Sequence, residues 1–456
     1  MNSVLRLGAA MASTLVLLVP AIWNRFPLLQ YDTGGYLARW FEGYLVPSRS
    51  TVFGLFLTLF ANPDFWPVVI VQAALTVWVL ALVLRAHGFG GRPLLLLGVI
   101  TALSILTTLP WLTSILLTDI FAGLAVLALH LLIFCDDALR RWERNALVAL
   151  IAFGVATHSA TFAVIVALVA AAMLAWWFLR IGAAAGIVRG IAAIAIGAVM
   201  LVGANFAVAG KLAWTPGGIA LSFGRMLQDG IVNRYLNDHC PEKRMKLCAH
   251  RHELPTDADV FFWSGKGGVF NRLGRFEGLG DEMETIVLGS LRAYPGLQIE
   301  MAFRATAHQL TRVATGEGVL NTVWHTYWAI EKFTPPATAD MKTARQQKGE
   351  LRFGKINRVH QPVAFASMLL LVAMMVLGLR REAFSDLGLL AATVTATLLA
   401  NAFVCGVLSN PHDRYGARLV WIAPLAMALL LCRLYARASR TGEVARPLAA
   451  EPIPPA

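Results

Sequence analysis

The chain has 456 residues, of which 57% are hydrophobic and only 14% are charged. Soluble domains carry about a quarter charged residues, so this composition excludes an ordinary soluble domain. It predicts an all-α polytopic membrane protein embedded in a lipid bilayer. The net charge of +12 does not indicate a nucleic-acid partner, because the arginines lie mainly in short loops between apolar segments, where membrane topology explains them.

Apolar runs long enough to cross a bilayer, about 17 to 25 residues each, recur along the chain. They predict about ten transmembrane helices, over about 4–23, 66–85, 93–109, 119–135, 146–157, 160–179, 190–209, 362–379, 386–406 and 419–436. The first is interpreted as a retained span, because Arg6 is the only basic residue before its long apolar run and no small-x-small cleavage site follows. The fifth is short, so it could form one long helix with the sixth or a separate short one. We favour the pair, and nine or twelve spans are the alternatives to ten.

The arginine bias assigns the two sides of the membrane. With the N-terminus in the cytoplasm, every short basic loop and the basic tail over 437–456 fall inside. These loops contain Arg85 and Arg92, then Arg140, Arg141 and Arg144, then Arg180 and Arg189, then Arg380 and Arg381. The scheme requires that the 11 apolar residues Thr51–Ala61 do not cross. We therefore expect a bacterial-type inner (plasma) membrane protein with both termini cytoplasmic.

The first outer loop, residues 24–65, carries the acidic residue Asp32 beside two glycines. Apolar groups at helical spacing follow, namely Tyr36, Leu37, Trp40, Phe41, Tyr44 and Leu45. Arg39 and Glu42 fall on the other face, so this stretch predicts an amphipathic helix lying in the membrane interface. The stretch Thr51–Ala61 becomes a second interfacial helix.

The remaining organisation follows from the apolar runs. Residues 1–210 form an N-terminal transmembrane module, and 362–436 form the C-terminal transmembrane helices. Between them, 211–361 is a polar extracytoplasmic insertion that shows helical periodicity and no alternating strand pattern, so we expect a mainly helical domain with long loops. The cytoplasmic tail ends in an Ala/Pro segment after Arg446 that is predicted to be disordered.

The cysteines fall into two groups. Cys135, Cys405 and Cys432 lie in or beside apolar runs and are interpreted as small core residues. Cys240 and Cys248 enclose seven residues in the insertion, which suits a disulfide in an oxidising compartment better than a metal site. No metal site is predicted, because the nearby His250–Glu253 has no third ligand at recognisable spacing. The SGKGG stretch, 264–268, lacks the full phosphate-loop pattern.

Three candidate residues face the outer side on this topology. Asp32 could act as a general base at the boundary between water and lipid, or it could simply cap the helix that follows. Asp119 stands at the start of a membrane helix, where an ionisable group is costly, and the same choice between function and capping applies. His158 could bind substrate, or it could satisfy backbone groups at the break between two helices.

The loop before the last span, NPHDRYGAR, concentrates charge at 410–418. It contains His412, Arg414, Tyr415 and Arg418, and guanidinium groups suit phosphate because they bind two oxygens at once. Charged loops before spans are common, however, and Asp413 could merely pair with an arginine. Arg39, Arg49 and Arg225 are further candidates for binding phosphate, with a surface or snorkelling role as the alternative for each.

Taken together, the layout resembles the GT-C superfamily of integral-membrane glycosyltransferases, which use polyprenyl-phosphate-linked sugars. The features that carry the resemblance are the acid in QYDTGGYLARWFEGYL, the connection VPSRSTVFGLFLTLF, the acid in LLTDIF and the loop PHDRYGARLVW. Two features depart from that family. This chain has a lone Asp followed by glycines where paired acids are frequent, and its extramembrane region precedes the last three spans.

The resemblance implies inverting sugar transfer on the outer face. Asp32 would be the catalytic base, Arg414 and Arg418 would bind the lipid phosphate, and Asp119 would orient the acceptor or a metal. The resemblance establishes no cofactor, although it leaves room for a divalent metal. The acceptor could be a glycan, a lipid or a protein.

Two other functions compete with this interpretation. A transporter or flippase of a lipid-linked substrate would show broken helices and midplane charges, often with an internal repeat, and neither is evident. A non-catalytic envelope assembly protein would use 211–361 as a binding module. In that case Asp32→Asn should leave its function intact.

Overall fold

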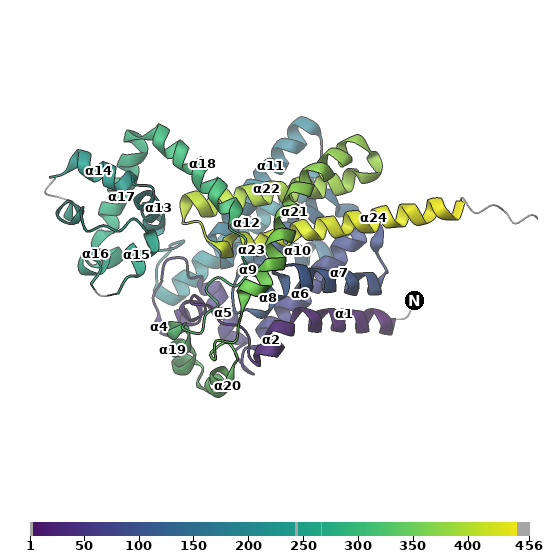
Figure 1. The fold of residues 1–456 in the computed structure, drawn as a ribbon, viewed down its shortest axis with the longest axis horizontal. Coiled ribbons are helices and arrows are strands. Elements are labelled where there is room, and N and C mark those ends of the chain that lie inside the picture. The colour runs from purple at the N-terminus through teal and green to yellow at the C-terminus, as the bar shows by residue number, and fades with distance from the viewer. Residues whose placement is uncertain (1–2, 242–244, 266, 445–456) are drawn as a thin grey trace, which may run out of the picture.

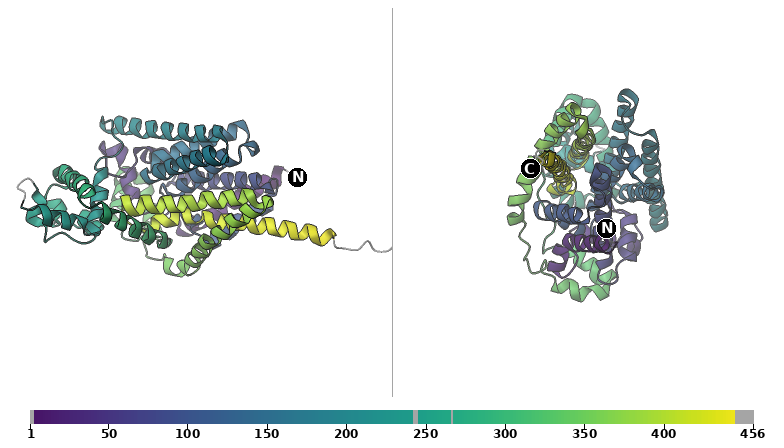
Figure 2. Two further views of the ribbon diagram at one scale, coloured as in Figure 1. Left: turned by 90° about the horizontal axis from the view of Figure 1, so that it is seen from above. Right: turned by 90° about the vertical axis from the view of Figure 1, so that its right-hand side faces the viewer.

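The computed structural model describes residues 3–241, 245–265 and 267–444. Within these ranges all regular structure is helical, apart from one isolated bridge between Leu28 and Ile115. A bundle of long helices forms most of the molecule, and a smaller helical lobe lies at one end of it (Figure 1). Figure 2 shows that the first helix and the last helix both lead to the opposite end. The segment predicted to be disordered after Arg446 lies outside the described residues, as does Lys266 of the SGKGG stretch.

The bundle is built around α9, Asp119–Phe134, in which every residue except Phe134 is buried. Because α9 is apolar on all sides, it packs against α6, α10, α12, α22 and α23 at once. The bundle helices are α1 Ser3–Leu17, α2 Val19–Asn24, α6 Trp66–Leu84, α7 Pro93–Leu106, α8 Leu109–Ser114, α10 Arg141–Thr157, α11 Ser159–Leu179, α12 Ala184–Ala209, α21 Phe353–Arg380, α22 Ser385–Leu408, α23 Asp413–Val420 and α24 Ile422–Val444. A π-helical turn, η1 Arg85–Phe89, extends α6, and short 3-10 turns occupy η2 Asp136–Ala138 and η5 Glu382–Phe384.

Six helical segments of the described chain are long and apolar enough to cross a membrane, which supports a multi-pass membrane protein. They are Trp66–Phe89, Ser159–Leu179, Ala184–Ala209, Phe353–Arg380, Glu382–Leu408 and Asp413–Ser439. The other four predicted spans fall on α1, α7, α9 and α10, which are shorter or less apolar, so the count of ten stays a prediction. The predicted pair of helices around His158 is confirmed, because extended backbone at that residue separates α10 from α11.

The first outer loop differs from the predicted amphipathic helix. It forms two very short helices, α3 Thr33–Leu37 and α4 Arg39–Glu42, and Gly43 ends the second with a left-handed backbone. The expectation that Arg39 lies on a polar face is wrong: its side chain is buried and bonds to the Gly35 and Tyr44 carbonyls and to Glu42. The next helix, α5 Thr51–Leu59, is too short to cross a membrane. Its first turn and Leu57 are buried against the bundle.

The predicted insertion 211–361 divides into two parts. The lobe in Figure 1 has a hydrophobic core of its own, and a disulfide joins Cys240 to Cys248 in it. Its helices are α13 Gly218–Gln228, α14 Ile231–His239, η3 Lys246–His250, α15 Ala258–Trp263, α16 Val269–Arg272 and α17 Arg275–Ala293. The next helix, α18 Pro295–Thr311, leads back from the lobe and packs along α22 of the bundle. The returning segment contains α19 Trp324–Phe333, η4 Pro335–Ala337 and α20 Thr338–Thr343, and it packs into the bundle core instead.

Ion pairs between loops gather the arginine-rich connections at one end of the bundle. Arg85 pairs with Glu143, and Asp136 accepts bonds from both Arg144 and Arg189. These contacts join the ends of α6 and α9 to the starts of α10 and α12. These three basic loops therefore share one end, as the arginine bias predicts, while the side of the membrane on which they lie stays a prediction.

The glycine at position 34 allows α19 to approach the first loop. A Cβ atom on Gly34 would lie 2.6 Å from the Thr326 Cα atom, and the Thr326 hydroxyl accepts a hydrogen bond from the Gly34 N–H at 3.0 Å. We predict that Gly34→Ala lowers stability by about 1–3 kcal/mol, because the methyl group overpacks this contact. Thermal unfolding in detergent should show a lower melting temperature. Gly98→Ala, in open space on α7, is the control, and equal melting of the two variants would contradict this packing.

Candidate functional site

Backbone pairing brings the first loop beside the segment that leads into α9. The Leu28 N–H donates to the Ser114 carbonyl at 2.9 Å, and the Leu116 N–H donates back to Leu28 at 3.0 Å. The Thr33 hydroxyl donates to the Leu116 carbonyl at 3.1 Å, and the Gln72 amide on α6 donates to two carbonyls of the same segment. This docking places Asp32 near Asp119, although 86 residues separate them in the chain.

The centre of the site is Arg414, whose guanidinium joins these two carboxylates. Its Nη1 lies 2.6 Å from Asp32 Oδ2, its Nε lies 2.7 Å from Asp119 Oδ2, and its Nη2 lies 3.2 Å from Asp119 Oδ1. All three side chains are at most 8% exposed. Asp32, Asp119 and Arg414, which come from distant parts of the sequence and were predicted to lie on one face of the membrane, therefore meet in one buried cluster.

Asp32 has a second guanidinium partner in Arg49, which bonds to Oδ1. Burial opposes ionisation of Asp32, but the charges of Arg49 and Arg414 outweigh it and hold the pKa of this carboxyl below its ordinary value of 3.8. Arg49 is the more accessible of the two arginines, with 19% of its side chain exposed against 7% for Arg414. Asp32 is consequently ionised in this structure.

Neither acid serves as the helix cap that the alternative interpretation proposed. Asp32 precedes α3, but its side chain makes no capping hydrogen bond, and Asp119 lies in the first turn of α9 beyond the cap position. The dipole of α9 still favours a negative charge at Asp119. Both carboxylates instead form ion pairs with arginine side chains.

Arg418, one turn after Arg414, is fully buried without a carboxylate partner among the described residues. Its guanidinium donates to Asn401 Oδ1 at 2.6 and 3.2 Å and lies 3.5 Å from the Cys405 sulfur. Its Nη1 lies 3.3 Å from His158 Nδ1. Two acids and three arginines thus leave the cluster formed by Asp32, Asp119, Arg49, Arg414 and Arg418 with a formal charge of +1.

His158 has both of the roles that the sequence leaves open. Its Nδ1 accepts a hydrogen bond from the Ala160 N–H at 3.1 Å, which caps α11, and the same atom faces Arg418. Burial and the charges of Arg418 and Arg414 hold the pKa of His158 well below 6.5, so the ring is neutral. Because Nδ1 is an acceptor, the proton of the neutral ring lies on Nε2.

His412 links the lobe to the start of α23. Its Nδ1 lies 2.9 Å from Glu317 and its Nε2 lies 3.3 Å from Asp259 of the lobe. Burial lowers the pKa of this imidazole, but bonding to the two carboxylates raises it to about 9. Glu317 also accepts a hydrogen bond from the Arg414 backbone N–H at 2.7 Å, so it fixes the turn that presents the Arg414 side chain.

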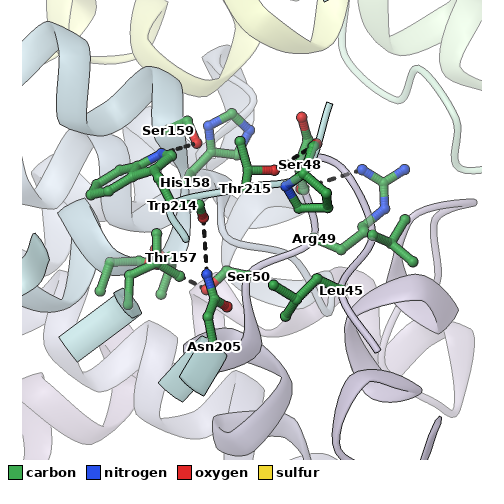
Figure 3. A pocket seen from close by; sticks show the side chains of 14 residues that line it. Leu45, Ser48, Arg49, Ser50, Thr157, His158, Ser159, Asn205, Trp214 and Thr215 are labelled. Atoms are coloured by element: carbon green, nitrogen blue, oxygen red, sulfur yellow. Dashed lines mark hydrogen bonds between the residues drawn. The ribbon is translucent and has the colours of Figure 1, made fainter. Parts of the chain in front are cut away.

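A polar pocket adjoins the cluster (Figure 3). Arg49 and His158 line it, together with the hydroxyl-bearing Ser48, Ser50 and Thr215. The hydroxyls of Ser50 and Thr215 already donate to backbone carbonyls, at Ala156 and Pro216. The cavity is therefore a site at which Arg49 and the His158 Nε2–H could bind an anion. Its apolar walls are Leu45, Val46, Ala156 and Leu201.

A second pocket ends at Asp119, Glu317 and Arg414. The rest of its wall is mainly apolar and includes Leu28, Trp111, Leu112, Leu117, Val319 and Phe353. Its acidic groups disfavour phosphate and suit hydroxyl groups. The two cavities thus differ in charge, and both adjoin the residues that hold Asp32.

The other predicted residues lie outside the central cluster. Arg39 uses its donors within its own loop, Arg225 pairs with Asp229 in the lobe, and Asp413 pairs with Arg312. Tyr415 is half-buried beside the cluster, where its ring contacts His412 at a centroid distance of 5.5 Å.

Sequence reasoning missed three residues that shape the site, namely Glu317, Asp259 and Asn401. Asn401 interrupts an apolar run, and a buried polar residue at membrane depth is a usable signal. Glu317 and Asp259 lie in polar segments without a motif, and only the fold brings them to His412.

The linkage through His412 predicts a pH effect on stability. A pKa raised from 6.5 to about 9 contributes stability that is complete below pH 6.5 and is lost as pH rises through 9. The difference in the free energy of unfolding between the native protein and His412→Gln should therefore be largest near about pH 6, at no more than about 3 kcal/mol, and should shrink by about pH 10. Thermal unfolding measured across this pH range checks it. A difference that stays constant over this range would contradict the bridge.

No family model, curated protein or solved structure matches this chain. The geometry of the buried cluster and its two cavities is therefore the basis on which a function is inferred.

Proposed function

We propose that the protein is a membrane glycosyltransferase that moves a sugar from a polyprenyl-phosphate donor to an acceptor hydroxyl. The observation that carries the proposal is the excess positive charge at a buried site. A buried guanidinium without a counter-ion, such as Arg418, is costly, and an anionic ligand in the adjoining cavity would offset that cost. A lipid-linked phosphate supplies such a charge at membrane depth.

The donor phosphate is assigned to the polar cavity in Figure 3. Arg49 and the His158 Nε2–H would bind its oxygens, and Arg418 lies directly behind His158. Arg49 is the arginine that can turn toward the phosphate, because it is more exposed than Arg414 and has no second carboxylate partner. The prenyl chain would leave over Leu45, Val46 and Leu201 toward the lipid.

Movement of Arg49 would convert Asp32 into a better base. In this structure two guanidiniums hold its pKa low, and losing one of them raises it. Asp32 would then take the proton of the acceptor hydroxyl while the acceptor oxygen forms a bond to the anomeric carbon. The bond from that carbon to the phosphate oxygen breaks, and Arg49 stabilises the negative charge that collects on the departing phosphate.

The acceptor is assigned to the second cavity, whose carboxylates accept hydrogen bonds from hydroxyl groups. Asp119 would orient the acceptor indirectly, by holding Arg414 against Asp32. The space between Asp32 and Asp119 is taken by the Arg414 guanidinium, so these two acids are not arranged to share a divalent metal.

The proposal places the arginine-rich end of the bundle in the cytoplasm and the site on the extracytoplasmic face of an inner (plasma) membrane. Ten spans, with both termini cytoplasmic, complete this topology. A disulfide between Cys240 and Cys248 in the lobe is in keeping with an oxidising compartment.

The test is sugar transfer from a polyprenyl-phosphate-linked sugar by the purified protein in detergent. We predict that Asp32→Asn lowers the transfer rate by about 10²–10⁴-fold, because a general base contributes that much. Asp137→Asn, an exposed acid at the arginine-rich end, is the matched control and should keep the native rate.

The same assay separates the competing functions. Native protein that moves the lipid-linked sugar across a vesicle membrane without transferring it would identify a transporter. Full function in the Asp32→Asn variant would identify a non-catalytic assembly protein, and either result would overturn the proposal.

A further inference from the structure

A second buried polar cluster lies at the arginine-rich end of the bundle. His87 follows α6 in the π-helical turn, His130 is in α9, and Cys135 comes directly after α9. One ligand atom from each lies within 4.8 Å of the others. Both histidines are 1% exposed, and Cys135 is half-buried.

Hydrogen bonds fix the tautomer of each imidazole. His87 Nδ1 is 2.8 Å from the Val83 carbonyl, which can only accept, so the proton of the neutral ring is on Nδ1. Thr393 gives its own hydroxyl proton to the Leu389 carbonyl at 2.9 Å. Its oxygen therefore accepts from His130 Nδ1 at 3.0 Å. Both rings keep a free electron pair on Nε2.

The two Nε2 atoms lie close to the sulfur atom of Cys135. His87 Nε2 is buried without a hydrogen-bond partner in the described structure, and His130 Nε2 lies 3.9 Å from Cys135 Sγ. The two rings are nearly parallel, with centroids 5.9 Å apart. Donors of one zinc ion with bonds of 2.0 to 2.3 Å lie about 3.5 Å apart, so small side-chain rotations would close the site.

We propose that His87, His130 and Cys135 bind a thiophilic d10 cation, Cu(I) or Zn(II), through two Nε2 atoms and one thiolate. Binding releases the thiol proton to solvent, since the thiolate is the ligand. Hydrogen bonds from Nδ1 to a backbone carbonyl and to a threonine hydroxyl are the outer contacts that metal-binding histidines ordinarily make. Two neutral imidazoles and one thiolate give a neutral complex with Cu(I), which favours that ion in an apolar site, whereas Zn(II) would call for a fourth ligand.

An apolar cavity adjoins this site. It lies among α9, α11, α21 and α22, and both His130 and Thr393 line it. The cluster is separate from the proposed transfer site, because the helical rise along α9 puts Cys135 about 24 Å from Asp119. A metal here would therefore stabilise the fold or take part in transport of the ion itself, and it would have no part in sugar transfer.

The test uses the full-length protein in detergent, loaded with Cu(I) under anaerobic reducing conditions or, in a second arm, with Zn(II). After buffer exchange, elemental analysis should find one more equivalent of metal in the native protein than in Cys135→Ser or His87→Gln. Cys432→Ser, which removes another half-buried thiol, is the control and should retain the native amount. The arm with the higher retention identifies the ion.

Thiol alkylation of the native protein gives an answer that does not depend on how the variants fold. The bound metal should protect Cys135 from alkylation, because the thiolate that would react is then a metal ligand, while Cys432 in the same molecules should react as before. Failure of both metals to protect Cys135, or metal retention that is equal in Cys135→Ser and Cys432→Ser, would overturn the proposal.

Discussion

The structure depends on one guanidinium that is shared by two buried carboxylates. Arg414 at the start of α23 holds Asp32 of the first loop and Asp119 of α9, so it ties together segments that are remote in the sequence. Buried pairs of this kind add little net stability when formed, but removing one partner leaves an unpaired charge that costs about 3–5 kcal/mol. The arrangement therefore specifies one geometry strongly, and the docked loop, the turn at Glu317 and the bridge to the lobe all support it.

The two pockets beside the cluster also differ in the charged residues that line them. The cavity beside Arg49 and His158 is electropositive, and the cavity beside Asp119 and Glu317 is acidic. In a site with little water such differences act strongly, because the effective dielectric constant is low. An anion and a hydroxyl-bearing acceptor would accordingly be sorted to opposite sides of Asp32. Under the proposed function, movement of the accessible Arg49 toward the anion would raise the pKa of Asp32 and make it a better base.

Much of the architecture could be predicted from the sequence, because apolar runs and arginine bias are local signals. All ten predicted runs fall on helices, and sidedness alone brought Asp32, Asp119 and Arg414 to one face. Arg39 was misplaced because helical periodicity takes no account of Gly43, which ends α4, or of the carbonyls that bind the guanidinium. Glu317 could not be foreseen, since it comes from a returning segment that enters the bundle. His87, His130 and Cys135 lie in or beside apolar runs, where a core role is the ordinary expectation for a cysteine.

The most direct measurement of the central claim is an experimental structure of the protein with a polyprenyl phosphate bound. We predict that the phosphate lies between Arg49 and His158, with Arg49 turned away from Asp32 and Arg414 still bonded to both acids. A phosphate bound elsewhere, or one that leaves the contact between Arg49 and Asp32 in place, would contradict it.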